Sequence, residues 1–158
     1  MERRIDPEKA APEVLRAMFA LETAVNKMGL ESNLVELVRL RASQINGCAY
    51  CIDVHSKDLR AEGESEERLY LLDAWREAPF YSDRERAALA WAESVTLIAD
   101  DHVPDDVYEQ ARQQFTDDEL AKLTLAVVAI NGWNRLKIAF RAAPGNYHPA
   151  PHREAAMA

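Results

Sequence analysis

Two cysteines and a histidine stand out because of their spacing. Cys48, Cys51 and His55 form the pattern C-x-x-C-x-x-x-H, and these are the two cysteines of the 158-residue sequence. On a helix that opens at Cys48, positions i, i+3 and i+7 share one face. The first turn of such a helix carries positive partial charge, which stabilises a thiolate. The pattern therefore predicts a reactive dithiol, with an imidazole one turn beyond Cys51 to accept or relay its proton.

Glu36 is expected to join this group. Gly47 predicts a very short connection between one helix and the next, so that the two helices form an antiparallel hairpin. Glu36 lies eleven residues before Gly47, which places it level with residues 55–58. A carboxylate beside His55 would fix the tautomer of the imidazole and raise its basicity. An ordinary surface ion pair with Arg39, three residues further on, is the alternative for Glu36.

These four residues could carry out thiol redox chemistry. One thiolate attacks the O–O bond of a peroxide and becomes a sulfenic acid, and the second thiol condenses with it to form a disulfide. An external dithiol then reduces the disulfide by exchange, while Glu36 and His55 move the protons. Two inert buried cysteines are one alternative. The other is a zinc site on Cys48, Cys51, His55 and Glu36, although structural zinc normally recruits a further Cys or His pair.

The rest of the sequence predicts helices throughout. Apolar residues recur at spacings of three and four, and the alternation of period two that marks strands is absent. Helices are expected over residues 12–28, 32–47, 48–62, 65 to before Pro79, 82 to about 97, a short segment with Pro104 near its first turn, and 116–142. We therefore predict an all-α, single-domain bundle of about six to seven helices over residues 1–158. The tail from about residue 144 is expected to be loose or to lie over a neighbour.

The last of these helices indicates an oligomer. The apolar residues Leu123 and 125–130 surround the whole helix circumference, which predicts either burial on all sides or contact with another subunit. Gly132 is unfavourable in a helix interior and predicts the close approach of another backbone at that point. A homo-oligomer is therefore expected.

The overall charge limits the partners. The sequence has 27 acidic and 19 basic residues and a formal net charge of −8. No basic stripe is available to displace counterions, so neither a nucleic acid nor an anionic membrane is expected as a partner. No apolar stretch is long enough to span a bilayer, and the N-terminal residues lack the apolar region of a secretory signal. A cytoplasmic location is therefore expected.

The segment ELVRLRASQINGCAYCIDVHSKDLRAEG, residues 36–63, resembles the core motif of the AhpD-like alkylhydroperoxidase family within the carboxymuconolactone decarboxylase superfamily. That motif has a Glu twelve residues before a CxxC and a His four residues after the second Cys. The later segment NGWNRL, residues 131–136, resembles the CxxC-containing peroxidase-related branch. The resemblance implies an all-helical fold in trimers or hexamers and no bound cofactor. It also implies a small hydroperoxide substrate and a dithiol, thioredoxin or lipoyl-type reductant.

The resemblance further implies that Cys51 is the peroxidatic thiol and Cys48 the resolving one. The residues alone favour the opposite order, because the first cysteine of a CxxC at a helix start is usually the more exposed. The position of Cys51 one turn from His55 supports the assignment from the family. Tyr50 stands where the best-known branch has a second His. It cannot act as a base at neutral pH, but its hydroxyl could hydrogen-bond a peroxide, so it is a possible substrate contact.

Two other functions remain open from the sequence. One is a lactone decarboxylase of the same superfamily, in which acid–base residues suffice without thiols. The other is a non-catalytic redox-sensing or binding module, which would form a reversible disulfide but consume negligible peroxide.

Overall fold

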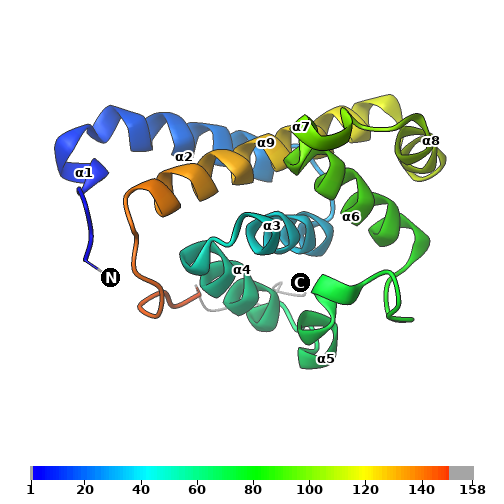
Figure 1. The fold of residues 1–158 in the computed structure, drawn as a ribbon, viewed down its shortest axis with the longest axis horizontal. Coiled ribbons are helices and arrows are strands. Elements are labelled where there is room, and N and C mark those ends of the chain that lie inside the picture. Colours follow the sequence, from blue (N-terminus) through cyan, green and yellow to red (C-terminus); the bar gives the residue numbers. More distant parts are fainter. Residues whose placement is uncertain (1, 150–158) are drawn as a thin grey trace, which may run out of the picture.

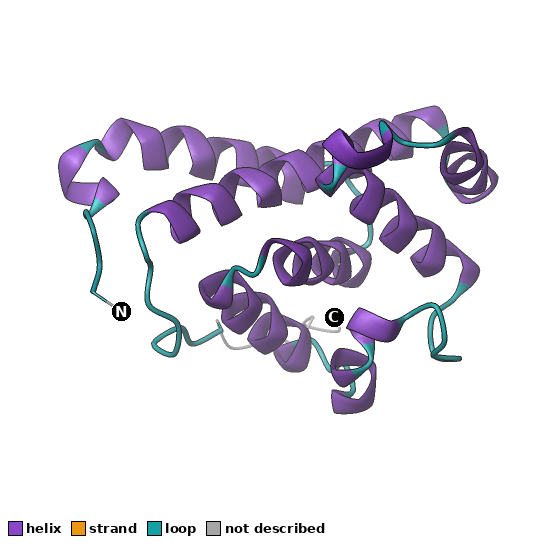
Figure 2. Cartoon of the chain, in the orientation of Figure 1, coloured by secondary structure: helices purple, strands orange, loops and turns teal. Residues whose placement is uncertain are grey.

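The computed structural model describes residues 2–149, which fold into nine α-helices and one short 3₁₀-helix (Figure 1). The helices are α1 Pro7–Ala10, α2 Pro12–Asn26, α3 Ser32–Asn46, α4 Ala49–Ala61, α5 Glu66–Tyr70, η1 Leu72–Ala74, α6 Asp83–Thr96, α7 Ile98–Asp101, α8 Asp105–Gln114 and α9 Asp117–Ala139. Within this range there are no strands, and short loops join the helices (Figure 2). The predicted all-α fold is confirmed. None of these helices is both long and apolar enough to cross a membrane.

Helix α3 lies at the centre of the molecule and packs against α4, α6 and α9 (Figure 1). Its apolar side chains pack on several sides, and Leu37 and Val38 are fully buried. Glu36 and Arg39 are buried on the same helix. Because a buried charge is costly unless it is paired and hydrogen-bonded, these two residues require a polar site beside the apolar core.

The structure excludes one of the two alternatives for the apolar residues of helix α9, and Gly132 differs from its prediction. Contact of the helix with another subunit stays a prediction. Leu123, Val127 and Ile130 are buried, but Val128 is 50% exposed, so the helix is not buried on all sides within this chain. A Cβ built on Gly132 would lie 3.0 Å from the terminal methyl of the Met18 side chain. The expected close approach of another backbone is therefore wrong within the described chain, because Gly132 makes room for a side chain of α2.

The segment after Gly63 also differs from its prediction. A single helix was expected to continue from residue 65 to before Pro79, but α5 ends at Tyr70 and the chain tightens into η1. Leu72 and Trp75 are buried, whereas Tyr70 is exposed. A 3₁₀ turn places residues i and i+3 on one side, so the tighter turn directs Leu72 and Trp75 together into the core. The short helices α1 and α7 were not predicted.

The beginning of the C-terminal tail is held against α4 rather than loose. The Gly145 amide donates a hydrogen bond to Asp53 at 2.9 Å, and the Lys57 ammonium donates to the Tyr147 carbonyl at 3.1 Å. The Tyr147 hydroxyl donates to Asp58 at 2.6 Å. Of the two alternatives for the tail, a loose segment is therefore excluded for residues 144–149, and the remainder, residues 150–158, lies outside the described part of the chain.

Candidate active site

The turn between α3 and α4 fixes the position of the two cysteines. Gly47 ends α3 in the left-handed conformation, at φ 66°, a conformation that costs free energy for any residue with a Cβ. The Asn46 amide donates hydrogen bonds to Asn131 at 3.0 Å and to Asn134 at 2.8 Å, both on α9. Asn134 in turn donates to the Ser43 hydroxyl at 3.0 Å. The turn is therefore anchored to α9 by a buried polar network.

Cys48 is the N-cap of α4, and its sulfur accepts a hydrogen bond from the Cys51 amide at 3.4 Å. The two sulfurs form a disulfide, with the Cα atoms 5.3 Å apart, a separation typical of disulfides. Both side chains are buried, because Cys48 is 1% exposed and Cys51 is 3% exposed. The first cysteine is therefore not the more exposed one. The CxxC pair therefore sits at the start of a helix, where the helix dipole favours a thiolate when the disulfide is reduced.

His55 and Glu36 meet across the α3–α4 hairpin. His55 Nδ1 lies 2.8 Å from Glu36 Oε2, and both side chains are largely buried. A carboxylate accepts rather than donates, so it favours the tautomer with the proton on Nδ1 and leaves Nε2 as the acceptor. The imidazole is therefore oriented by an acid on the neighbouring helix.

Arg39 holds the other side of this carboxylate. Its buried guanidinium pairs with both Glu36 and Glu22, and it donates a hydrogen bond to Asn26 at 2.7 Å. The Trp133 indole N–H donates to Glu22 at 3.1 Å. The alternative pair of Glu36 with Arg39 thus exists, but it is buried and forms part of the same network as His55.

The surroundings of Glu36 decide its protonation state. Burial by itself would raise the pKa of this carboxyl, but the hydrogen bond and charge of His55 and the guanidinium of Arg39 outweigh burial. The pKa of Glu36 is therefore lowered from its ordinary value, and the group is a carboxylate at neutral pH.

A cavity of about 350 Å³ opens beside these residues. It is lined by Phe19, Glu22, Asn26, Glu36, Arg39, Tyr50, Cys51, Val54, His55, Asp58, Trp133, Lys137 and Tyr147. Cys51 and Tyr50 are in this lining, whereas Cys48 is not. A small molecule in the cavity would therefore meet Cys51 and His55 before it could meet Cys48.

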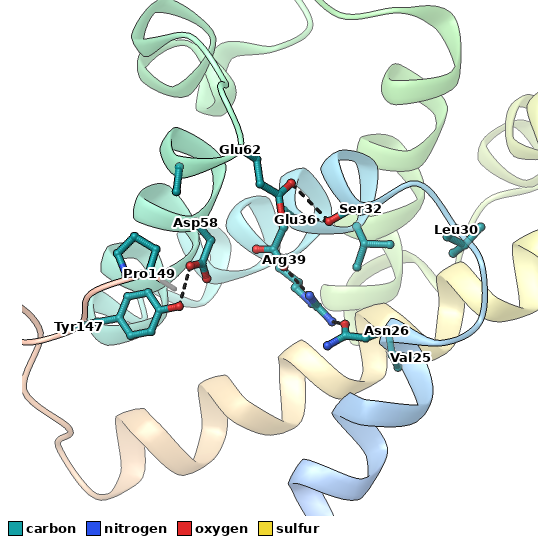
Figure 3. Close-up of a pocket in the computed structure, with 12 residues that line it drawn as sticks. Val25, Asn26, Leu30, Ser32, Glu36, Arg39, Asp58, Glu62, Tyr147 and Pro149 are labelled. Carbon is teal, nitrogen blue, oxygen red and sulfur yellow. Dashed lines mark hydrogen bonds and ion pairs between the residues drawn. The ribbon is translucent and has the colours of Figure 1, made fainter. Parts of the chain in front are cut away.

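A second cavity of similar volume shares part of its lining with the first, and Figure 3 shows the residues that line the second cavity. Asn26, Glu36, Arg39, Asp58 and Tyr147 line both cavities, and the figure shows the Tyr147 hydroxyl pointing to Asp58. Burial raises the pKa of Asp58 and the charge of Glu36 raises it further, against the opposing hydrogen bond from Tyr147. The wall between the cavities therefore contains a second carboxyl near the Glu36–His55 pair.

The side chains that could together bind a metal ion differ from the predicted zinc ligands. Within residues 2–149, Glu36, His55 and Asp58 place one potential ligand atom each within 4.8 Å of one another. Neither cysteine belongs to this set, and in the disulfide neither sulfur is the thiolate that zinc requires. Arg39 already pairs with Glu36 and would repel a cation. The structure thus does not assemble the zinc ligand set of two cysteines, His55 and Glu36.

Several residues of the cavity were not found from the sequence. Asp58 and Tyr147 come together although they are 89 positions apart, and Lys137 reaches the cavity from α9. No local pattern marks such residues. Trp133 packs against the core cluster that contains both cysteines, and it also lines the cavity.

The fold and site define an all-α protein with a CxxC disulfide next to a buried Glu–His pair. Residues 12–94 match the Carboxymuconolactone decarboxylase family, and the chain belongs to that family. It is 40% identical over 139 residues to the uncharacterized protein YdfG of Bacillus subtilis, covering 88% of this chain and 95% of YdfG. It is 30% identical over 129 residues to the uncharacterized protein YnjA of Escherichia coli, covering 82% of this chain and 68% of YnjA.

Solved structures agree with this assignment. The Agrobacterium tumefaciens protein ATU0492, of unknown function and named as a candidate antioxidant defence protein AhpD, superposes with a TM-score of 0.90 at 45% identity. The match covers 92% of this chain and all of that one. The debrominase Bmp8 superposes with a TM-score of 0.78 at 16% identity over 87% of this chain and 74% of Bmp8, which shows a shared fold alone. The resemblance to AhpD-like proteins is thus confirmed.

Proposed function

We propose that the protein is a CxxC-dependent peroxidase that reduces small organic hydroperoxides through the Cys48–Cys51 disulfide. The observation that carries the proposal is the placement of Cys51, His55 and Glu36 around one cavity, next to a cysteine that can form a disulfide with Cys51. AhpD-type antioxidant defence, the role suggested for the Agrobacterium relative, agrees with this chemistry.

The reaction would begin with the reduced dithiol. His55 takes the proton of Cys51, and the Cys51 thiolate attacks the terminal oxygen of the hydroperoxide. The S–O bond forms as the O–O bond breaks, and the leaving alkoxide receives the proton from His55 and departs as the alcohol. Cys51 is then a sulfenic acid. Cys48 attacks that sulfur, its thiol proton leaves with the hydroxide as water, and the disulfide forms.

An external dithiol would close the cycle. It attacks the Cys48–Cys51 disulfide, leaves oxidised as a disulfide itself, and returns both cysteines to thiols. No metal or organic cofactor takes part in either half of this cycle. The lining of the cavity supports Cys51 as the peroxidatic thiol and Cys48 as the resolving thiol, because Cys51 is the cysteine in the cavity wall.

The test is hydroperoxide consumption with a dithiol reductant by the wild type and by Cys51→Ser, Cys48→Ser and His55→Ala variants. We expect Cys51→Ser to abolish turnover and His55→Ala to lower it by about 10²-fold or more, as for the removal of a general base. Cys48→Ser should retain one stoichiometric burst of peroxide consumption and accumulate a sulfenic acid, which dimedone would label. Equal rates in all four proteins would exclude the proposal.

The same variants separate the alternatives. A lactone decarboxylase would retain activity on a lactone in the Cys48→Ser, Cys51→Ser double variant. A redox-sensing module would form the disulfide with peroxide once per chain and show no sustained turnover with the dithiol. The homo-oligomer stays a prediction, which sedimentation equilibrium of the wild type would check.

A further inference from the structure

Lys137 lines the active-site cavity and has no carboxylate partner among residues 2–149. Its ammonium lies 4.4 Å from the centre of the Tyr50 ring and 5.4 Å from that of Trp133. Within residues 2–149 the ammonium makes neither a hydrogen bond nor an ion pair, although the side chain is half-buried. Arg39, which also lines this cavity, pairs with two carboxylates.

The acidic groups of the cavity are occupied elsewhere. Glu22 and Glu36 are both bound by Arg39, and Asp58 accepts the hydrogen bond of Tyr147. Burial lowers the pKa of Lys137, and the nearby charge of Arg3 lowers it further, against the opposing charge of Glu8. The aromatic faces offset part of the cost of burying this cation. Because the rest of this cost is not offset, the ammonium would be stabilised by an anion that enters the cavity.

The walls next to Lys137 are aromatic and apolar. Phe19 is 59% exposed and lies with its ring centre 5.1 Å from that of Trp133. Tyr50 and Val54 contribute the adjoining wall. A volume of about 350 Å³ is at the small end of ligand pockets. The cavity therefore suits a small molecule with a flat apolar body.

We propose that Lys137 binds the carboxylate of a small molecule whose apolar body lies against Phe19, Tyr50 and Trp133. This inference rests on the proposed function, because it assigns the anionic group to one of the two reactants that come to Cys51. The carboxylate belongs either to the hydroperoxide or to the dithiol reductant. The shared chemistry is a carboxylate on an apolar skeleton, and the experiment distinguishes the two sources.

The first arm measures binding without turnover. Calorimetry compares 4-isopropylbenzoate with its neutral amide on the oxidised protein. We expect the wild type to bind the benzoate about tenfold more tightly than the amide, as one charge-assisted contact allows. Lys137→Met should remove this preference and Lys137→Arg should retain it. Lys122→Met is the matched control on the same helix, since Lys122 pairs with Asp118 at 2.6 Å and is not in the cavity lining.

The second arm measures turnover with paired substrates. Cumene hydroperoxide is compared with its 4-carboxy derivative, and dihydrolipoamide with dihydrolipoate. A rise of about tenfold in KM on Lys137→Met, confined to the carboxylated hydroperoxide or to dihydrolipoate, supports the proposal and identifies the reactant. Lys122→Met should leave every KM unchanged.

The outcomes separate this inference from the proposed function. Equal binding of the benzoate and the amide by the wild type overturns the role of Lys137, whatever the peroxidase assay shows. If the wild type binds the benzoate more tightly than the amide, Lys137→Met removes this preference and no hydroperoxide is consumed, the anion site is supported and the peroxidase is overturned.

Discussion

Glu36 presents one carboxylate oxygen to His55 and the other to Arg39. Oε2 lies 2.8 Å from His55 Nδ1, and Oε1 accepts from the Arg39 guanidinium. Since His55 is on α4 and Glu36 is on α3, this pair also joins the two helices that meet at Gly47. The carboxylate is fixed on both sides, so it can hold the imidazole in one orientation while Cys51 reacts.

Replacement of Glu36 by Gln should lower peroxide turnover by about tenfold to a hundredfold, because the amide no longer imposes the His55 tautomer or stabilises the imidazolium. The measurement is kcat with a dithiol reductant, together with urea unfolding to show that the variant folds. Glu22→Gln is the matched control, since Glu22 pairs with the same guanidinium and does not contact His55. Equal losses in the two variants would indicate that Arg39, rather than His55, carries the effect.

Asp58→Asn should stabilise the folded protein at neutral pH. Burial raises the pKa of Asp58, and Glu36 raises it further. Because the folded-state pKa lies above the ordinary value of 3.8, ionised Asp58 destabilises the fold at high pH. Asparagine keeps the oxygen that accepts from Tyr147 and removes the charge. We expect a gain of about 0.5 kcal/mol in the free energy of unfolding at pH 7.

The pH dependence of that gain checks its cause. The gain should shrink as pH falls through the folded-state pKa and vanish below about pH 3.8, where Asp58 is protonated in both states. Asp53→Asn is the control of opposite sign. The hydrogen bonds from Lys57 and the Gly145 amide lower the pKa of Asp53, so its removal should destabilise the fold at pH 7. A gain for Asp58→Asn that is equal at pH 7 and pH 4 would exclude the electrostatic explanation.

The parts of this site that could be predicted from the sequence are those fixed by local geometry. Gly47 at a helix end, followed directly by an N-cap, determines a hairpin, and the hairpin places Glu36 level with His55. The capping boxes that begin with Ser82 and Thr116 mark the starts of α6 and α9 for the same local reason.

The other parts depend on contacts between distant segments. Tyr147 reaches Asp58 only because the chain after α9 turns back along α4, and nothing in the neighbouring residues indicates that path. The sequence around Lys137 is typical of a surface lysine, and only the packing of α9 places its ammonium over the Tyr50 ring. Leu72 and Trp75 fit a helical pattern, and the core packing selects a 3₁₀ turn instead.

Gly132→Ala should leave the chain as stable as before or more stable, by up to about 1 kcal/mol. Alanine is better than glycine in a helix interior by that amount. The added Cβ meets the terminal methyl of Met18, which can rotate away because it is the far end of a flexible side chain. Urea unfolding would measure the change. A clear destabilisation that coincides with a lower sedimentation mass would instead indicate that a second chain packs against Gly132.

Gly47 and Gly63 form a matched pair for testing how the α3–α4 turn controls the disulfide. Both end a helix segment at positive φ, 66° and 93°, and a Cβ at either would meet no atom of residues 2–149 within 4 Å. Substitution of either by Ala should therefore cost about 1 kcal/mol of unfolding free energy, from backbone strain alone.

The two variants should differ at the disulfide. Gly47 directly precedes Cys48, whose sulfur is buried and outside the cavity lining, so attack of a reductant on that sulfur requires local opening. A strain of about 1 kcal/mol at that turn should raise the population of the open form, and with it the rate of disulfide reduction by dithiothreitol, about fivefold in Gly47→Ala. Gly63→Ala should show the wild-type rate, because its strain lies at the far end of α4. Equal rates in both variants would show that access to the disulfide does not depend on this turn.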